Sequence, residues 1–206
     1  MVNASSKLVL RTDDARGVTT LTLNRPEAFN ALSEDLLSDL QDTLDDLAQD
    51  KKLRVVVIAA SGKAFCAGHD LREMRANPSL DYYQKLFSQC GRMMMRIQTL
   101  QVPVIAKVQG IATAAGCQLV AQCDLAVASS DARFAVSGVN LGLFCATPSV
   151  ALTRNLTRKA AFEMLVTGDF INAQEAMAKG LVNRVVSSDR SEERRVGKEC
   201  RSRWSP

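Results

Sequence analysis

A β-strand with apolar residues on both faces is predicted for the stretch Leu53-Arg54-Val55-Val56-Val57-Ile58-Ala59-Ala60. A second apolar run occupies residues 102–108, and each run leads through small residues into a helical pattern. Such continuous runs are typical of strands that are buried on both faces of a parallel sheet. Because strands alternate with helices along the chain, the sequence predicts the α/β fold class.

Outward from this stretch, short apolar segments continue in both directions. Their spacing predicts strands at residues 7–11, 18–24, 125–128, 133–136 and 181–186, and helices at 80–100, 147–155, 159–167 and 173–179. Ser33 is an expected helix N-cap, because leucines follow it at helical spacing. No internal sequence repeat is evident, and we expect one core domain over residues 1–187.

The composition excludes several classes of protein. With 47% hydrophobic and 23% charged residues and a net charge of only +4, it gives no argument for a nucleic-acid or membrane partner. No apolar run approaches the ~18 residues of a membrane span. A single histidine and the absence of a C-x-x-C pair argue against a metal site. Cysteines among small apolar residues favour reduced, buried thiols; these are Cys66, Cys117, Cys123 and Cys145.

Residues 188–206 form a second, different segment, which is charge-dense and has no amphipathic period. We expect it to be disordered or to be non-native sequence. A basic arm that binds nucleic acid is the less favoured alternative, since a short charged tail is usually only solvated.

Two segments of small residues, 64–70 and 112–118, carry the clearest functional signal. Each follows a buried strand and turns into a helix, so its backbone N–H groups are open to a ligand that approaches closely. Two such turns that face each other would form an oxyanion hole for an enolate or a tetrahedral oxyanion. The alternative is tight strand–helix packing without a ligand.

Four segments, in order along residues 7–187, resemble the enoyl-CoA hydratase/isomerase family, also called crotonases. They are Leu23-Asn24-Arg25-Pro26-Glu27-Ala28-Phe29-Asn30-Ala31-Leu32, Ala64-Phe65-Cys66-Ala67-Gly68-His69-Asp70-Leu71, Val104-Ile105-Ala106-Lys107-Val108-Gln109-Gly110 and Cys123-Asp124-Leu125-Ala126. The resemblance implies a spiral of β-β-α units and, at full length, a homotrimer or a dimer of trimers. It also implies an acyl-CoA thioester as the substrate, with no further cofactor.

The resemblance assigns roles to individual residues. It places the two backbone N–H groups that hold a thioester enolate at His69 and Ala115. The CoA moiety is expected along Arg25, Glu27 and Ala28. The other expected binding positions are Ala67, Gly68, Asp70, Leu71 and Gly110.

Two positions depart from the family pattern. Hydratases of the family carry two glutamates that hold and activate water, and here these positions are Gln118 and Gly138. Neither residue supplies a titratable group for general acid–base catalysis. The resemblance therefore implies a protein of fatty-acid or acyl-CoA metabolism that is hydratase/isomerase-like, and the two departures predict weak or no hydratase activity. The alternative is a non-catalytic acyl-CoA-binding or regulatory paralogue.

Other polar groups lie near the expected site. His69 is either an acid or base near neutral pH or only a hydrogen-bonding side chain. Asp70 is a better candidate for the N-cap of a helix that begins at Leu71 than for a base. Cys145 has no evident histidine partner, so buried packing is favoured over a nucleophile. Ser137 and Asn140 are expected to line the pocket as neutral polar groups.

Three further expectations concern relatives, length and location. Residues 67–71, 114–121 and 138–148 resemble one subgroup of the family. The family continues past the strand at 181–186 with helices that cover the acyl pocket, so we expect a truncated chain with exposed apolar surface. Residues 1–6 show no signal core or transit pattern, which favours the cytoplasm, with the mitochondrial matrix as the alternative.

Overall fold

Two β-sheets organise residues 7–188, the part of the chain that this computed structural model describes. The larger sheet has the order β1 (Val9–Asp13), β2 (Val18–Leu23), β3 (Val55–Ala60), β5 (Val104–Val108), β7 (Leu125–Ser129) and β10 (Arg184–Val186). The smaller sheet has the order β4 (Ala64–Cys66), β6 (Ile111–Thr113), β8 (Arg133–Ala135) and β9 (Ile171–Asn172). Apart from β1 with β2 and β8 with β9, neighbouring strands are parallel.

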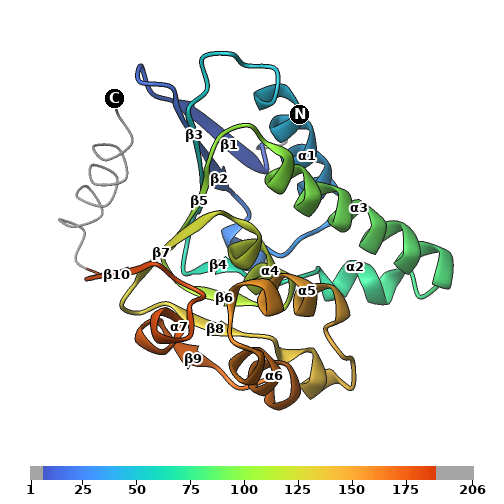
Figure 1. Cartoon of the computed structure of the whole chain (residues 1–206). Helices are drawn as coiled ribbons and strands as arrows, with labels where there is room; N and C mark the ends of the chain where they lie inside the picture. The colour runs from blue at the N-terminus through green and yellow to red at the C-terminus, as the bar shows by residue number, and fades with distance from the viewer. Residues whose placement is uncertain (1–6, 189–206) are drawn as a thin grey trace.

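The helices follow the strands in a regular order. They are η1 (Pro26–Ala28), α1 (Glu34–Leu47), α2 (Leu71–Ala76), α3 (Leu80–Thr99), α4 (Ala115–Gln122), η2 (Ser137–Leu141), α5 (Ala146–Asn155), α6 (Arg158–Thr167) and α7 (Ala173–Lys179). In three successive units (β3-β4, β5-β6 and β7-β8) the first strand joins the larger sheet, the second joins the smaller one, and helices follow (Figure 1). This arrangement confirms the predicted α/β class and the spiral of β-β-α units.

The apolar stretch that forms β3, at the start of the first of these units, lies at the centre of the larger sheet. Val56 and Ile58 of β3 are fully buried, and β3 lies between β2 and β5 in parallel register. The leucine stripe of α1 is also fully buried, and α3 packs along α1 (Figure 1). Ser33 caps α1 as predicted, because its side chain accepts the N–H of Leu36 at 3.2 Å.

The smaller sheet was not predicted in full. Residues 64–66 and 111–113, expected as loop, are the strands β4 and β6, which pair with each other in parallel. Strands of only three residues are too short to carry a periodic signal, and they form here because each supplies the other's hydrogen-bond partners. The two-residue strand β9 was missed for the same reason.

Further expectations can be compared with the described residues. The five cysteines among them are all free and buried: Cys66, Cys90, Cys117, Cys123 and Cys145. Large apolar side chains are exposed at several places, as expected, including Phe144, Val150 and Phe162. In residues 7–188 no helix is long and apolar enough to cross a membrane. The expectations for the charged segment lie outside the described residues.

Candidate active site

The two small-residue turns lie side by side because β4 and β6 are parallel neighbours whose carboxyl ends meet at one edge of the smaller sheet. The chain leaves β4 toward Gly68 and leaves β6 toward Ala114. A Cβ atom added to Gly68 would lie 3.0 Å from the Ala114 Cβ and 3.4 Å from the Ala115 nitrogen. Only glycine at position 68 therefore allows the turns to approach this closely.

The backbone N–H group of His69 is left free by the bonds of its neighbours. The Leu32 N–H donates to the Gly68 carbonyl at 2.7 Å, and the Asp70 N–H donates to the Leu32 carbonyl at 3.2 Å. Because a trans peptide group is planar, the Gly68 carbonyl and the His69 N–H point in opposite directions. The His69 N–H thus points away from Leu32, and no acceptor for it is present among residues 7–188.

The N–H group of Ala115 is oriented in the same way. Ala115 begins α4, and the carbonyl of Ala114 accepts the first helical bond from the Gln118 N–H at 3.0 Å. The Ala115 N–H therefore points out of the helix N-terminus, where a helix offers free donors and positive potential. Ala114 itself has φ +50°, a conformation that costs a non-glycine residue roughly 1–3 kcal/mol and redirects the chain from β6 into α4.

Two further glycines have packing roles here. A Cβ on Gly116 would lie 2.1 Å from the Cys66 carbonyl oxygen, so glycine lets α4 start directly against the end of β4. A Cβ on Gly110 would lie 2.0 Å from the Lys63 carbonyl oxygen. The contact explains why glycine is needed at position 110, which sequence reasoning assigned to ligand binding.

The segment expected to bind CoA folds as η1 and ends in two residues of left-handed conformation, Phe29 and Asn30. Asn30 is fully buried and fastens the segment in place. Its Oδ1 accepts the Arg25 N–H at 2.8 Å, and its Nδ2 donates to the carbonyls of Ser61 and Ala64, each at 2.9 Å. Arg25 and its neighbours are thereby held beside β4. No motif or spacing in the sequence signals this role of Asn30.

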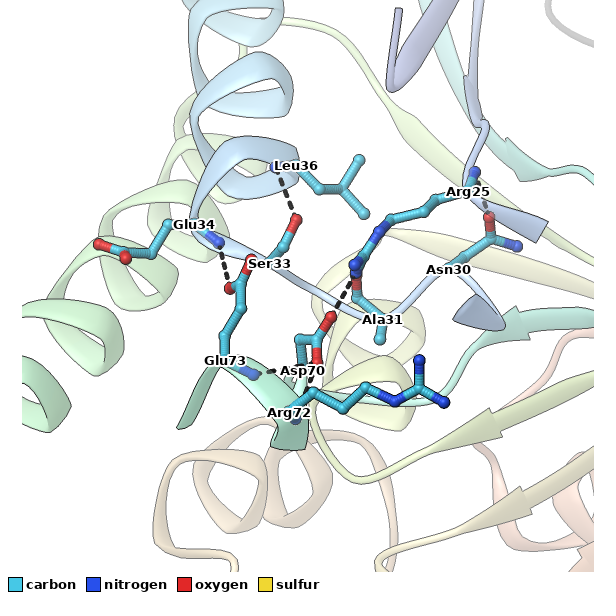
Figure 2. Close-up of polar contacts among 9 residues, drawn as sticks. All are labelled: Arg25, Asn30, Ala31, Ser33, Glu34, Leu36, Asp70, Arg72 and Glu73. Atoms are coloured by element: carbon cyan, nitrogen blue, oxygen red, sulfur yellow. Dashed lines mark hydrogen bonds and ion pairs between the residues drawn. The ribbon is translucent and has the colours of Figure 1, made fainter. Parts of the chain in front are cut away.

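Asp70 is the N-cap of α2, as predicted. One carboxylate oxygen accepts the N–H groups of Arg72 and Glu73 at 2.9 and 3.3 Å, and the other accepts Arg25 Nη1 at 2.6 Å (Figure 2). Burial alone would raise the pKa of this carboxyl, but the bonds from Arg25 and the two N–H groups outweigh burial and hold the pKa below its usual value. A carboxylate that is bonded on both oxygens is a poor candidate for a catalytic base.

The His69 side chain is largely buried and packs edge-on against the ring of Phe87, with centroids 5.2 Å apart and an interplanar angle of 76°. Burial lowers the pKa of this imidazole to about 4, so it is neutral at pH 7. Its Nδ1 atom has no hydrogen-bond partner in the described part of the chain.

Gln118, the first position at which a departure from the family pattern was predicted, is 6% exposed, and its Oε1 atom has no partner among the described residues. It lies three residues after Ala115 on α4, so both residues share one helix face. Side chains on a helix lean toward its N-terminus, which directs Gln118 toward the Ala115 N–H. The amide thus offers a neutral hydrogen-bonding group to a ligand at this point.

Gly138, the second position at which such a departure was predicted, has no room for a side chain. A Cβ there would lie 2.4 Å from Cys145 Sγ and 2.5 Å from the Leu143 carbonyl oxygen. Cys145 is 9% exposed, and burial raises the pKa of its thiol, as expected for packing.

Among the neutral polar groups, Ser137 lies at the site, because its Oγ is 2.9 Å from Oγ1 of Thr113 at the end of β6. Thr113 lies in the segment 112–118, but the sequence had not assigned a role to its hydroxyl group. Asn140 is exposed, and its side-chain amide faces Gly168 at the end of α6. Among residues 7–188, no group of three or more His, Cys, Asp or Glu side chains could hold a metal ion.

Comparisons with known proteins define the class. The sequence pattern of the enoyl-CoA hydratase/isomerase family matches residues 13–201. This match, together with the spiral of β-β-α units, shows that the chain belongs to that family.

Within the family, the chain is similar to the mitochondrial enoyl-CoA hydratase domain-containing protein 3 of Xenopus laevis. The identity is 48% over 203 residues, which cover 95% of this chain and 68% of that protein. The human protein of that name is 49% identical, over 82% of this chain and 56% of its own length. The chain spans 56% to 68% of the length of the vertebrate relatives.

Solved structures of proteins with these family names have a similar fold. The crystal structure of enoyl-CoA hydratase from Mycobacterium smegmatis is 64% identical with a TM-score of 0.89, over 94% of this chain and 76% of that one. The crystal structure of human enoyl-CoA hydratase domain-containing protein 3 is 43% identical with a TM-score of 0.89, over 96% of this chain and 77% of that one.

Proposed function

We propose that this protein binds an acyl-CoA thioester, whose carbonyl oxygen lies between the N–H groups of His69 and Ala115. The observation that carries the proposal is the orientation of these two donors. Each belongs to a peptide whose carbonyl is already bonded, to Leu32 in one case and to Gln118 in the other, and neither N–H group has a backbone acceptor within residues 7–188. Two preorganised N–H donors are the arrangement that stabilises a thioester enolate.

The remaining parts of the ligand follow from this placement. The CoA moiety lies along Arg25, Glu27 and Ala28, with Ala67, Gly68, Asp70 and Leu71 beside it. The acyl chain extends toward Gln118 and the hydroxyl pair of Thr113 and Ser137. No further cofactor takes part. The segment that contains Arg25, Glu27 and Ala28 is anchored beside β4 through Asn30, and this anchoring supports the placement of the CoA moiety.

For the reaction, we propose a hydratase/isomerase-like enzyme of fatty-acid or acyl-CoA metabolism with weak or no hydratase activity. A Gln118 amide orients water but cannot remove a proton, and the space at Gly138 is filled. The relatives named as enoyl-CoA hydratases favour an enzyme. The two departures favour the alternative, a non-catalytic acyl-CoA-binding or regulatory paralogue.

Two measurements test this function. Titration calorimetry with butyryl-CoA is expected to show binding by the wild-type chain, and the absence of binding would contradict the proposal. Hydration of crotonyl-CoA is expected to be slow or absent and to increase in Gln118→Glu. This single change is preferable to one that includes Gly138→Glu, because a side chain at 138 collides with Cys145 and Leu143. Rapid wild-type hydration that is lost in His69→Ala would instead identify an imidazole-based mechanism.

We also propose a homotrimer or a dimer of trimers for the full-length protein, without a nucleic-acid partner. Sedimentation measures the oligomeric state. Salt-dependent binding of DNA or RNA would contradict the proposed absence of a nucleic-acid partner. For location, we propose the cytoplasm. The vertebrate relatives carry mitochondrial names, which supports the alternative of the mitochondrial matrix.

A further inference from the structure

Arg25 connects the two segments that surround the Gly68–His69 peptide. Its Nη1 atom donates to Asp70 Oδ2 at 2.6 Å and to the Ala31 carbonyl at 3.2 Å (Figure 2). The side chains of Arg25 and Asp70 are 22% and 7% exposed, so the ion pair is shielded from solvent. Ala31 precedes Leu32 in the chain, and Asp70 follows His69. The guanidinium therefore joins a residue next to Leu32 to a residue next to His69.

The contact between Leu32 and His69 needs such support. It is an isolated β-bridge, made of the bond from Leu32 N–H to the Gly68 carbonyl and the bond from Asp70 N–H to the Leu32 carbonyl. An intramolecular hydrogen bond contributes only about 1 kcal/mol net, and no strand extends this bridge on either side. Yet the first of these bonds sets the direction in which the His69 N–H points.

We infer that Arg25 and Asp70 are a positioning pair, which holds the Gly68–His69 peptide so that its N–H group faces the thioester oxygen. The inference rests on the proposed function and adds the ion pair that aligns one of its two donors. Neither side chain touches the reacting atoms in this arrangement. Because Arg25 also begins the segment proposed to hold CoA, the pair links the CoA contact to the carbonyl contact.

A comparison of two ligands separates positioning from general stability. Butyryl-CoA carries the carbonyl oxygen, whereas the thioether S-butyl-CoA has the same chain without it. The dissociation constant of S-butyl-CoA divided by that of butyryl-CoA therefore reports on the carbonyl contact. We expect a ratio of about tenfold or more in the wild-type chain, and a ratio reduced about fivefold or more in Asp70→Asn and in Arg25→Met. Asparagine is as good an N-cap as aspartate, so Asp70→Asn removes the charge and keeps the cap of α2.

The matched control is Arg75→Met, which removes an exposed charge from the same helix and should leave the ratio unchanged. Thermal melts establish that each variant is folded, and if Arg25→Met does not fold, Asp70→Asn decides. A wild-type ratio that persists in the folded variants would overturn the inference and leave the proposed function standing. Equal weakening of both ligands would also overturn it. Failure of the wild-type chain to bind either ligand, or equal binding of both, would overturn the proposed function and the inference together.

Discussion

The sulfur atom of Cys145 lies where a side chain at Gly138 would begin, 2.4 Å from the position of the missing Cβ. The Leu143 carbonyl occupies the other side of this position, at 2.5 Å. The glycine is therefore matched to the segment that packs over it, so one substitution could not introduce a carboxylate side chain at position 138. Residues 143–145 would have to move as well.

The first prediction concerns this packing. Gly138→Ala should lower the free energy of unfolding by about 1–3 kcal/mol, because the added methyl group overlaps Cys145 and Leu143. Gly91→Ala is the control: Gly91 lies within α3, an added Cβ meets nothing within 4 Å, and the change should stabilise the protein by about 0.5–1 kcal/mol. Urea denaturation measures both. Equal stability of Gly138→Ala and the wild type would show that residues 143–145 shift easily.

The second prediction concerns Gln118. Its buried Oε1 atom has no partner within residues 7–188, so Gln118→Met should raise the free energy of unfolding of the ligand-free chain by about 1 kcal/mol. Gln89→Met should do the opposite, because Gln89 Nε2 donates to the Glu34 carbonyl and to Ser38 Oγ at 2.9 and 2.8 Å. Chemical denaturation of both variants provides the comparison. A destabilised Gln118→Met would mean that the amide is already satisfied, for example by water.

The third prediction concerns pH, and it uses the only histidine of the chain. Burial lowers the pKa of His69 to about 4 in the folded protein, whereas an unfolded chain titrates near 6.5. Between these values the unfolded state binds more protons, so stability must fall as the pH falls from 6.5 to 4. We expect a loss of about 1–2 kcal/mol between pH 7 and pH 5 that is absent in His69→Gln. Identical pH dependence in the two proteins would contradict a buried, neutral imidazole.

The fourth prediction concerns Asp70, whose pKa is held below its usual value by Arg25 and the α2 N-terminus in spite of burial. A lowered carboxyl pKa stabilises the folded state above the unfolded value, and the contribution is lost as the pH falls through the folded value. Asp70→Asn should therefore be less stable than the wild type at pH 7, by about 1–3 kcal/mol, and the difference should shrink below about pH 4. Urea titrations at several pH values test this, and a difference that grows in acid would refute it.

Much of the architecture was predictable because its signals are local. The apolar run of β3, the leucine stripe of α1 and the caps Ser33 and Asp70 are each encoded within a few neighbouring residues. Hydrophobic periodicity and side-chain capping act over one or two turns of chain, so they can be recognised without a structure. The two turns that carry the candidate site were found in the same way, as small residues between a strand and a helix.

The sequence by itself thus determined the α/β class and the family pattern, and through the resemblance it predicted the residues whose backbone N–H groups form the candidate site. Only the tertiary structure decided the direction in which these N–H groups point and which residues surround them. The pairing of β4 with β6, the bridge between Leu32 and His69, and the Arg25–Asp70 bond join residues far apart in the chain, the last of them 45 residues apart. Such contacts form only when separate units pack together, so neither composition nor spacing records them. The same holds for the sulfur of Cys145 beside Gly138, since the volume left for a side chain is a property of the packed molecule.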